Sequence, residues 1–322
     1  MSNESTTTSL AALTHPSLVQ PVLIKALSEK SGLYRYARQF DLRMQATAAA
    51  KIPIQTAWWG TPADHGALVD TELNASEGAA LGNTQQSASS VTVTATEFGV
   101  QMAVTDQVAE QALSAIDVYG AISGSMLTAM LLAWESDYLT LASSLSNSVG
   151  TTNTTATIAI MVSAQTGLRS RGVDADAIAY ILDNVAGNAI ETAFTATNAA
   201  AAVYSFAADR ILAWNPAGDN GMGGNRLIAS FRGYPVNTTG LTITANAGVD
   251  ANSMCVCPST AYNDASGATT HAMAIKRLPR LRSDAASATA IGSRSTIMVL
   301  DSMVGFGEIQ DGAGTYILAK AS

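Results

Sequence analysis

The chain has 322 residues and a formal net charge of −8, and only 6% of its residues are aromatic and 13% charged. This length allows one large domain or two modest ones, and a charged share of about half the usual value indicates a surface largely buried against other protein. The charge distribution excludes a protein that binds nucleic acid over its whole surface, because residues 52–168 hold ten acidic residues and no Lys or Arg.

The first 51 residues are basic, with six Lys or Arg against three acidic residues. Residues 1–14 are rich in Ser and Thr, a composition typical of a disordered end. Residues 17–51 place apolar side chains at helical spacing between basic ones: Leu18, Val22, Leu27, Leu33, Tyr36 and Phe40. We expect an arm that lies across a neighbouring subunit rather than a core element. Either the basic arm and the acidic middle attract each other across subunits, or the difference is ordinary surface variation.

Residues 52–90 predict a long projecting hairpin. Two short apolar stretches, Ile52–Ile54 and Trp58–Gly60, precede a polar run from Asp70 to Ser90 that is rich in Gly, Asn, Gln and Ser. No compact core can form from such a run. A connection of this length is either functional or disordered, and here it leads into a predicted strand at Val91.

The stretch from Val91 to Asn147 predicts a strand, a short helix and then a long helix. Thr and apolar residues alternate from Val91 to Thr96, and the alternation changes phase after Phe98-Gly99, which indicates a bulge or bend near Gly99. Thr105 or Asp106 is expected to cap a short helix that ends at Leu113, and Ser114 with Asp117 has the spacing of a capping box that restarts the helix.

The long helix, expected from Ile116 onward, is apolar over most of its circumference. One row at near-helical spacing comprises Val118, Ile122, Met126, Met130, Trp134, Tyr138 and Leu141, and a second row comprises Tyr119, Leu127, Leu131 and Leu132. Such a helix is covered on most sides in a folded protein. A membrane span is the alternative, but the uncharged run is short and has no flanking Lys or Arg, so we favour a buried spine.

A mixed α/β region follows a Ser/Thr/Asn linker over residues 146–157. The pattern predicts a helix over Ile158–Leu168, a strand over Ala177–Leu182 and a flexible loop over Asn215–Asn225. Further short strands are expected at 227–229, 233–236, 241–243, 254–256 and 271–275, and closing strands are expected within 294–318.

Few residues have the type and spacing that a catalytic, metal or disulfide site requires. The cysteines, Cys255 and Cys257, are too close for a common disulfide, and the three histidines, His15, His65 and His271, form no cluster. We therefore expect no enzyme activity, no metal and no cofactor, and a reducing compartment. No signal peptide is expected, because no basic region precedes an apolar run at the N-terminus. The basic cluster Lys276–Arg282 either contacts an acidic partner or nucleic acid, or is a solvated turn.

The order of these elements resembles tailed-bacteriophage major capsid proteins. The resemblance is carried by the basic arm, the polar hairpin, the T-E-F-G-V strand at Thr96–Val100, the V-Q-M-A-V-T-D strand at Val100–Asp106 before the long helix, the R-G-Y-P-V segment at Arg232–Val236 and the returning C-terminal strands. It implies an α+β, HK97-like fold. The implied parts are an N-terminal arm (1–51), an extended loop (52–97), a peripheral domain with the spine helix (98–148), an axial domain with a central mixed sheet (150–271) and a return to the peripheral domain (272–322).

The resemblance also implies a function. Such subunits form pentamers and hexamers of an icosahedral shell in the virion, which assembles in the host cytoplasm and encloses double-stranded DNA without sequence specificity. Further partners would be a portal and a scaffolding or decoration protein, and no membrane. We expect the arm and loop to supply contacts between subunits through Arg35, Arg38, Trp58, Trp59, Glu72 and Glu77. Some family members join a loop Lys to a neighbouring Asn; residues 52–168 hold no Lys, so we expect a non-covalent shell.

Two other functions compete with this one. An encapsulin, a cellular compartment of the same fold, would hold cargo enzymes instead of DNA. A secreted adhesin or surface-layer subunit would also be rich in Ala, Ser and Thr, but the missing signal peptide and the buried spine helix argue against it.

Overall fold

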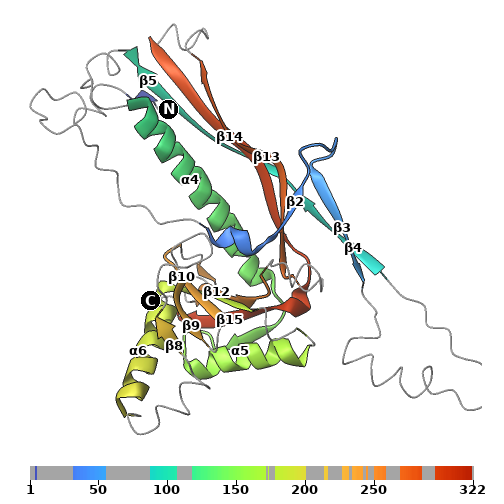
Figure 1. Cartoon of the computed structure of the whole chain (residues 1–322), viewed down its shortest axis with the longest axis vertical. Helices are drawn as coiled ribbons and strands as arrows, with labels where there is room; N and C mark the ends of the chain where they lie inside the picture. The colour runs from blue at the N-terminus through green and yellow to red at the C-terminus, as the bar shows by residue number, and fades with distance from the viewer. Residues whose placement is uncertain are drawn as a thin grey trace, which may run out of the picture.

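The computed structural model describes residues 4–5, 32–55, 88–106, 118–171, 173, 178–200, 214–216, 227–231, 234–241, 244–245, 250–258, 269–284 and 294–320. The fold is α+β. One long helix packs on a five-stranded sheet, a second region holds a larger mixed sheet with two helices, and a two-stranded hairpin projects from the side (Figure 1).

The first region is built around two long antiparallel strands, β13 (His271–Asp284) and β14 (Ser295–Glu308). The sheet order is β1-β5-β14-β13-β2, in which β5 (Thr96–Thr105) is antiparallel to β14, and the edge strands β1 (Glu4–Ser5) and β2 (Arg38–Asp41) are parallel to their neighbours. Helix α4 (Val118–Thr140) lies along one face of this sheet (Figure 1).

The second region is an eight-stranded mixed sheet in the order β6-β15-β12-β7-β10-β9-β8, with β11 paired to β12. The strands are β6 (Ser148–Gly150), β7 (Ala179–Asp183), β8 (Trp214–Pro216), β9 (Leu227–Phe231), β10 (Tyr234–Thr239), β11 (Thr244–Ala245), β12 (Asp250–Val256) and β15 (Gly314–Lys320). Helices α5 (Ile158–Ser170) and α6 (Asn184–Ala200) pack beside it. The predicted helix near 158–168 and strand near 177–182 are confirmed.

The predicted projecting hairpin is confirmed at its base. Strand β3 (Ala49–Gln55) pairs antiparallel with β4 (Ala88–Thr94) over their whole lengths, in a sheet of their own. Gly305 of β14 has no side chain where the carbonyl of Thr94 approaches, which lets the hairpin cross the larger sheet closely. Residues 56–87 lie outside the described part of the chain.

The predicted bulge near Gly99 is wrong. Gly99 pairs with Asp301 in a regular ladder that runs without a shift from Thr96 to Thr105. The change of phase occurs instead at Ala95, whose N–H still bonds the Ala48 carbonyl at 2.8 Å, where the chain leaves the hairpin and enters the five-stranded sheet. The short helix expected to end at Leu113 lies outside the described residues.

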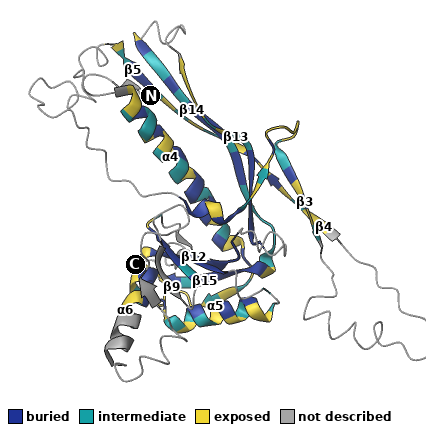
Figure 2. Cartoon of the chain, viewed as in Figure 1, coloured by how far each residue is buried: buried dark blue, intermediate teal, exposed yellow. Residues whose placement is uncertain are grey.

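Helix α4 buries the first predicted row against the sheet and leaves the second row partly open. Met126, Met130 and Tyr138 are fully buried, whereas Tyr119 is 38% and Leu127 40% exposed. Figure 2 shows that buried and exposed residues alternate along α4. The expectation that the helix is covered on most sides is therefore wrong for the described residues, because the sheet covers only one face. Among the described helices, none combines the length and the apolar character that a membrane crossing requires.

The N-terminal stretch also differs from expectation. Residues Leu33–Tyr36 form a short 3-10 helix whose side chains Leu33, Tyr34 and Tyr36 are buried in the same core cluster as Trp134 of α4. The prediction that residues 17–51 contain no core element is thus wrong for this part of the stretch, because its aromatic side chains fill the space beside α4.

Candidate assembly surfaces

An arginine cluster lies on the face of the five-stranded sheet around Asp301. The Asp301 side chain is 4% exposed, and its carboxylate pairs with Arg277 at 2.8 Å, Arg280 at 3.2 Å and Arg282 at 3.0 Å. Arg277 also pairs with the exposed carboxylate of Glu97 on β5. We call these five residues the arginine cluster.

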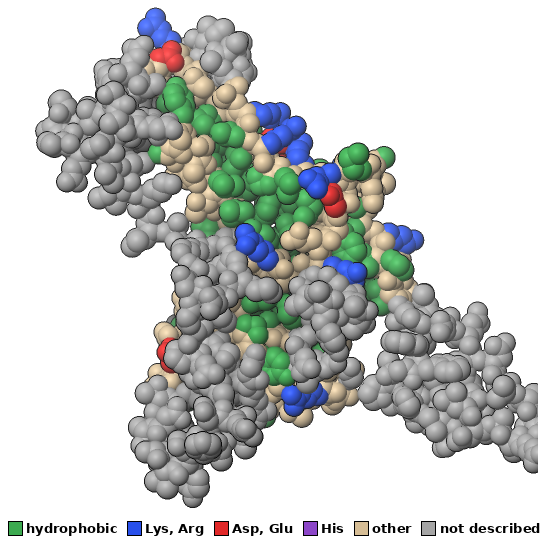
Figure 3. All heavy atoms as spheres, in the orientation of Figure 1, with side chains coloured by type: hydrophobic (Ala, Val, Ile, Leu, Met, Phe, Trp, Pro, Cys, Tyr) green, Lys and Arg blue, Asp and Glu red, His purple; other side chains and the backbone are tan. Residues whose placement is uncertain are grey.

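The cluster carries more positive than negative charge and is open to solvent. Three guanidinium groups face two carboxylates, and the side chains of Arg280 and Arg282 are 50% and 56% exposed. Figure 3 shows Lys and Arg side chains gathered along the edge of the molecule where Figure 1 draws β13. Each Arg fork has five N–H donors, so the shared Asp301 leaves several of them available to an anionic partner.

The solvated turn considered for Lys276–Arg282 is wrong, since the segment is part of strand β13. Its pairing with β14 shifts on both sides of Arg277, and Pro279 falls within the shifted part. Lys276 is also held locally, because its ammonium group donates to the carbonyls of Leu42 (3.2 Å) and Gln45.

The stretch that begins at Gly32 is anchored to helix α4 and to the eight-stranded sheet. The Gly32 N–H donates to the buried carboxylate of Glu135 at 2.6 Å, and the Tyr34 ring meets Trp134 edge to face with centroids 5.6 Å apart. The Tyr36 hydroxyl accepts a hydrogen bond from Asn237 of β10 at 2.8 Å, and burial raises the pKa of Tyr36. These contacts join α4 to the eight-stranded sheet through the N-terminal stretch.

A second junction joins the two sheets where β14 leads into β15. The Asp311 carboxylate accepts the Ser146 N–H at 2.7 Å, and Glu308 accepts the Ser144 hydroxyl at 2.6 Å. Burial raises the pKa of Glu308. Arg171, at the end of α5, donates to the carbonyls of Gly312 and Gly314 at 2.8 and 2.9 Å. These contacts hold the two segments that connect the regions, 144–146 and 308–314, to each other and to the end of α5.

His271 and the two cysteines are buried in the core, and burial favours the neutral form of each side chain. His271 lies against Tyr138, with His271 Nδ1 3.4 Å from the Tyr138 hydroxyl, and burial lowers the pKa of His271 to about 3. Burial raises the pKa of the Cys257 thiol to about 12 and that of the Cys255 thiol well above its ordinary value, so both thiols stay protonated. Within the described residues, no three His, Cys, Asp or Glu side chains gather as metal ligands would.

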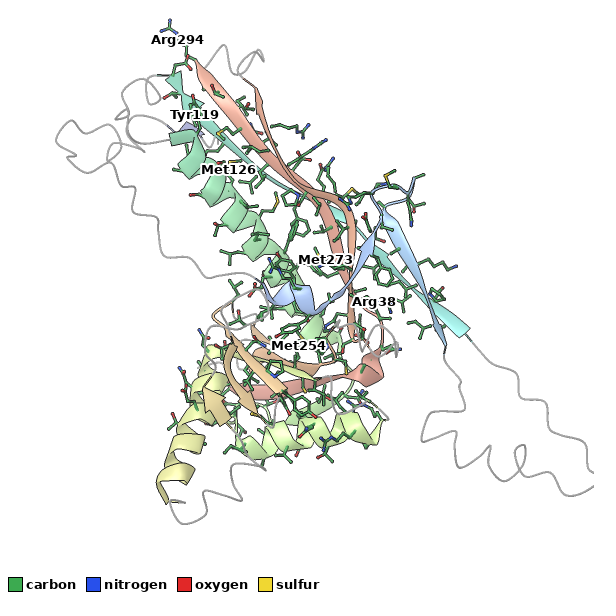
Figure 4. All side chains as sticks on the ribbon, in the orientation of Figure 1. Arg38, Tyr119, Met126, Met254, Met273 and Arg294 are labelled. Atoms are coloured by element: carbon green, nitrogen blue, oxygen red, sulfur yellow. The ribbon has the colours of Figure 1, made fainter. Side chains whose placement is uncertain are left out.

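The structure locates two of the six predicted contact residues. Arg35 is exposed, and Arg38 on β2 is half-buried with its guanidinium carbon 5.6 Å from the centroid of the Phe40 ring (Figure 4). Trp58, Trp59, Glu72 and Glu77 lie outside the described residues. The arginine cluster was not among the predicted contacts. The sequence indicates this cluster only through its run of basic residues. Asp301 lies about twenty residues further along the chain and comes next to the arginines only because β13 pairs with β14.

The fold resembles capsid subunits over most of its length. The capsid of cyanophage P-SCSP1u matches with a TM-score of 0.62 and 12% identity over 94% of this chain and 91% of that chain, and Mycobacterium phage Che8 matches with 0.62 and 11% over 94% and 96%. An encapsulin of Synechococcus elongatus matches with 0.58 and 9% over 92% of each chain. No protein-family model and no curated protein matches the sequence. The chain therefore has the HK97-like fold of tailed-phage capsids.

Proposed function

We propose that this chain is a shell-forming major capsid protein that assembles into the pentamers and hexamers of an icosahedral virion shell. The observation that carries the proposal is the fold, which matches phage capsid subunits over 94% of the chain. The role is structural rather than catalytic. We keep the five predicted parts, with boundaries at residues 51, 97, 148 and 271, as part of this proposal.

The hairpin is the element best placed to join subunits. Strands β3 and β4 pair only with each other and point away from α4 (Figure 1), so the loop they carry starts outside the body of its own subunit. That loop, residues 56–87, contains four acidic residues and no Lys or Arg. The excess positive charge of the arginine cluster on a neighbour provides a complementary surface. The predicted contacts Glu72 and Glu77 would bind there, beside Trp58 and Trp59.

Charge reversal tests this assembly contact. The double variant Arg280→Glu/Arg282→Glu is expected to prevent closed shells from forming, as seen by electron microscopy of the purified protein. Adding Glu72→Lys and Glu77→Lys to the same chain is expected to restore them, because the charges become complementary again. Arg43→Glu is the matched control, since Arg43 pairs with Asp41 in its own turn. Normal shells from the first double variant would contradict the proposed contact.

An encapsulin-type compartment is the second candidate, because an encapsulin shares the fold. The two functions differ in contents. Particles purified from the native source after nuclease treatment are expected to contain protected double-stranded DNA if the chain is a phage capsid protein. Particles that contain a cargo enzyme and no DNA would favour the compartment. A portal, a scaffolding or decoration protein, and assembly in the host cytoplasm belong to the capsid proposal.

A further inference from the structure

The hairpin of β3 and β4 packs at its base across β13 and β14 (Figure 1). The contact is a core cluster of its own, which we call the hairpin seat. Its buried residues come from the hairpin, from the two long strands and from the turn before β3: Leu42, Ala50, Ile52, Val93, Ala95, Ala272 and Ala274. Because Met273 belongs to the core beneath α4, the seat lies on the opposite face of the sheet.

Two glycines of β14 make this contact possible. A Cβ at Gly305 would lie 2.0 Å from the carbonyl oxygen of Thr94, and a Cβ at Gly307 would lie 2.7 Å from a methyl group of Val93. Neither glycine has a positive φ, so a side chain would suit the backbone at both positions. Space rather than conformational freedom therefore requires glycine here, as where another backbone approaches a strand closely.

The chain is also held where it enters and leaves the hairpin. Before β3, the Leu42 N–H donates to the Ile275 carbonyl at 2.8 Å. After β4, the Thr96 hydroxyl donates to the Val304 carbonyl at 3.3 Å. The hairpin is thus fixed at both ends and along its base, so its direction follows from how closely it approaches the two glycines.

We propose that Gly305 and Gly307 set the direction in which the hairpin leaves the subunit, and through it the angle between neighbouring subunits. The inference rests on the proposed function, in which the hairpin joins subunits. Strand β4 extends about 17 Å from Thr94 to Ser89, at ~3.3 Å per residue, so a small tilt at the seat is magnified where the loop begins. The two glycines are positioning residues, because they act through the hairpin.

Spin labels measure this direction in dissociated subunits. Nitroxides at Ser89→Cys on β4 and Ser163→Cys on α5 report the distance between hairpin and body by pulsed electron paramagnetic resonance. Both serines are exposed in the structure. The native Cys255 and Cys257 are at most 1% exposed, so they remain unlabelled.

Gly305→Ala is expected to shift the label distance by ~2 Å or more, because the Thr94 backbone must move away from the new methyl group and the tilt grows along β4. Gly99→Ala is the matched control. Gly99 lies in the same sheet, but a Cβ there would meet nothing within 4 Å. The control is expected to keep the wild-type distance.

Gly307→Ala adds a variant that a second substitution can rescue, because its new methyl group meets a side chain rather than the backbone. It is expected to shift the label distance, and Gly307→Ala/Val93→Ala is expected to return to the wild-type distance. Val93→Ala is expected not to rescue Gly305→Ala, whose collision is with the Thr94 carbonyl. If Gly305→Ala does not fold, Gly307→Ala and its rescue decide the outcome.

Electron microscopy then tests the angle between subunits. Wild type, Gly99→Ala and Gly307→Ala/Val93→Ala are expected to give closed shells of the same diameter, whereas Gly305→Ala and Gly307→Ala are expected to give open assemblies or shells of another diameter. An unchanged label distance in the folded single variants would overturn the proposal, and so would a shifted distance with shells of wild-type diameter. A wild-type chain that forms no shells would contradict the proposed function, while the label distances would still show whether the glycines set the hairpin direction.

Discussion

Asp301 is the buried acidic residue at the centre of the arginine cluster. Its carboxylate forms ion pairs with three arginines, although its side chain is only 4% exposed. Its carboxylate offsets the mutual repulsion of three guanidinium groups that lie close together on β13. The cluster thus has a structural role in each subunit as well as its proposed role between subunits.

Asp301→Asn is expected to lower the free energy of unfolding by about 1–3 kcal/mol, because the arginines lose their shared charged acceptor. Glu97→Gln is the matched control. Its side chain is 64% exposed, so removal of its charge is expected to change stability by less than about 1 kcal/mol. Chemical denaturation of dissociated subunits measures both values. Equal effects for the two variants would show that burial of Asp301 does not matter.

His271 is expected to make the subunit less stable in acid. Its pKa is about 3 in the fold, because burial disfavours the charged ring, and about 6.5 when unfolded. Between these values only the unfolded chain takes up the proton. Stability is therefore fully present above pH ~6.5 and falls by about 1.4 kcal/mol for each pH unit below it, down to pH ~3.

The variant His271→Gln isolates this effect. Burial also raises the pKa of Asp137 and of Glu308, and these carboxyls stabilise the fold as the pH falls, with the opposite sign. The difference in unfolding free energy between wild type and variant, measured from pH 7 to pH 4, removes their contribution. We expect the variant to lose the acid-dependent part of the decline. A pH-independent difference would mean that His271 is not held neutral.

At the scale of elements, the sequence predicts a helix or strand correctly when its apolar pattern reflects packing against a single surface. The buried row of α4 repeats at helical spacing against a single sheet, so it is evident without the structure. Its exposed second row was misjudged, because the composition alone does not tell which apolar face is covered within the subunit.

Two other elements show why local patterns fall short. Helix α6 was missed because Gly, Asn and Thr lower its helix propensity; its start is fixed instead by the Asp183 carboxylate, which accepts the Val185 N–H at 2.9 Å. The sequence predicts only the first part of strand β13, residues 271–275, because the basic cluster Lys276–Arg282 that follows fits a solvated turn as well as a strand, and Pro279 lies within it. Proline is accepted there because the pairing register shifts around it.

The loop carried by the hairpin is expected to be required for assembly and dispensable for folding. Replacing residues 56–87 with Asn-Gly keeps β3 and β4 in register, since Gln55 pairs with Ala88 and a two-residue turn suits such a hairpin. The shortened chain is expected to give soluble subunits with wild-type unfolding behaviour that form no shells. Closed shells of normal size would show that the loop does not join subunits.

At the scale of the whole molecule, the distribution of lysine bears on how the shell is held. Residues 52–168 contain no Lys, and the nearest one, Lys51, lies in β3 at the base of the hairpin. An isopeptide bond from the loop requires an amine that this loop lacks. Mature particles boiled in detergent and reductant are therefore expected to run as one band near 33.1 kDa. A ladder of pentamer- and hexamer-sized species would reveal a covalent link.

The central claim is that this chain closes into a shell of pentamers and hexamers. Cryo-electron microscopy of the purified protein, produced alone and together with the products of its neighbouring genes, tests that claim most directly. The expected result is closed icosahedral particles in which α4 and the five-stranded sheet lie at the periphery of each capsomer and the loop of one subunit reaches the arginine cluster of the next. Particles that never form under either condition, while the subunits remain folded and soluble, would contradict the account.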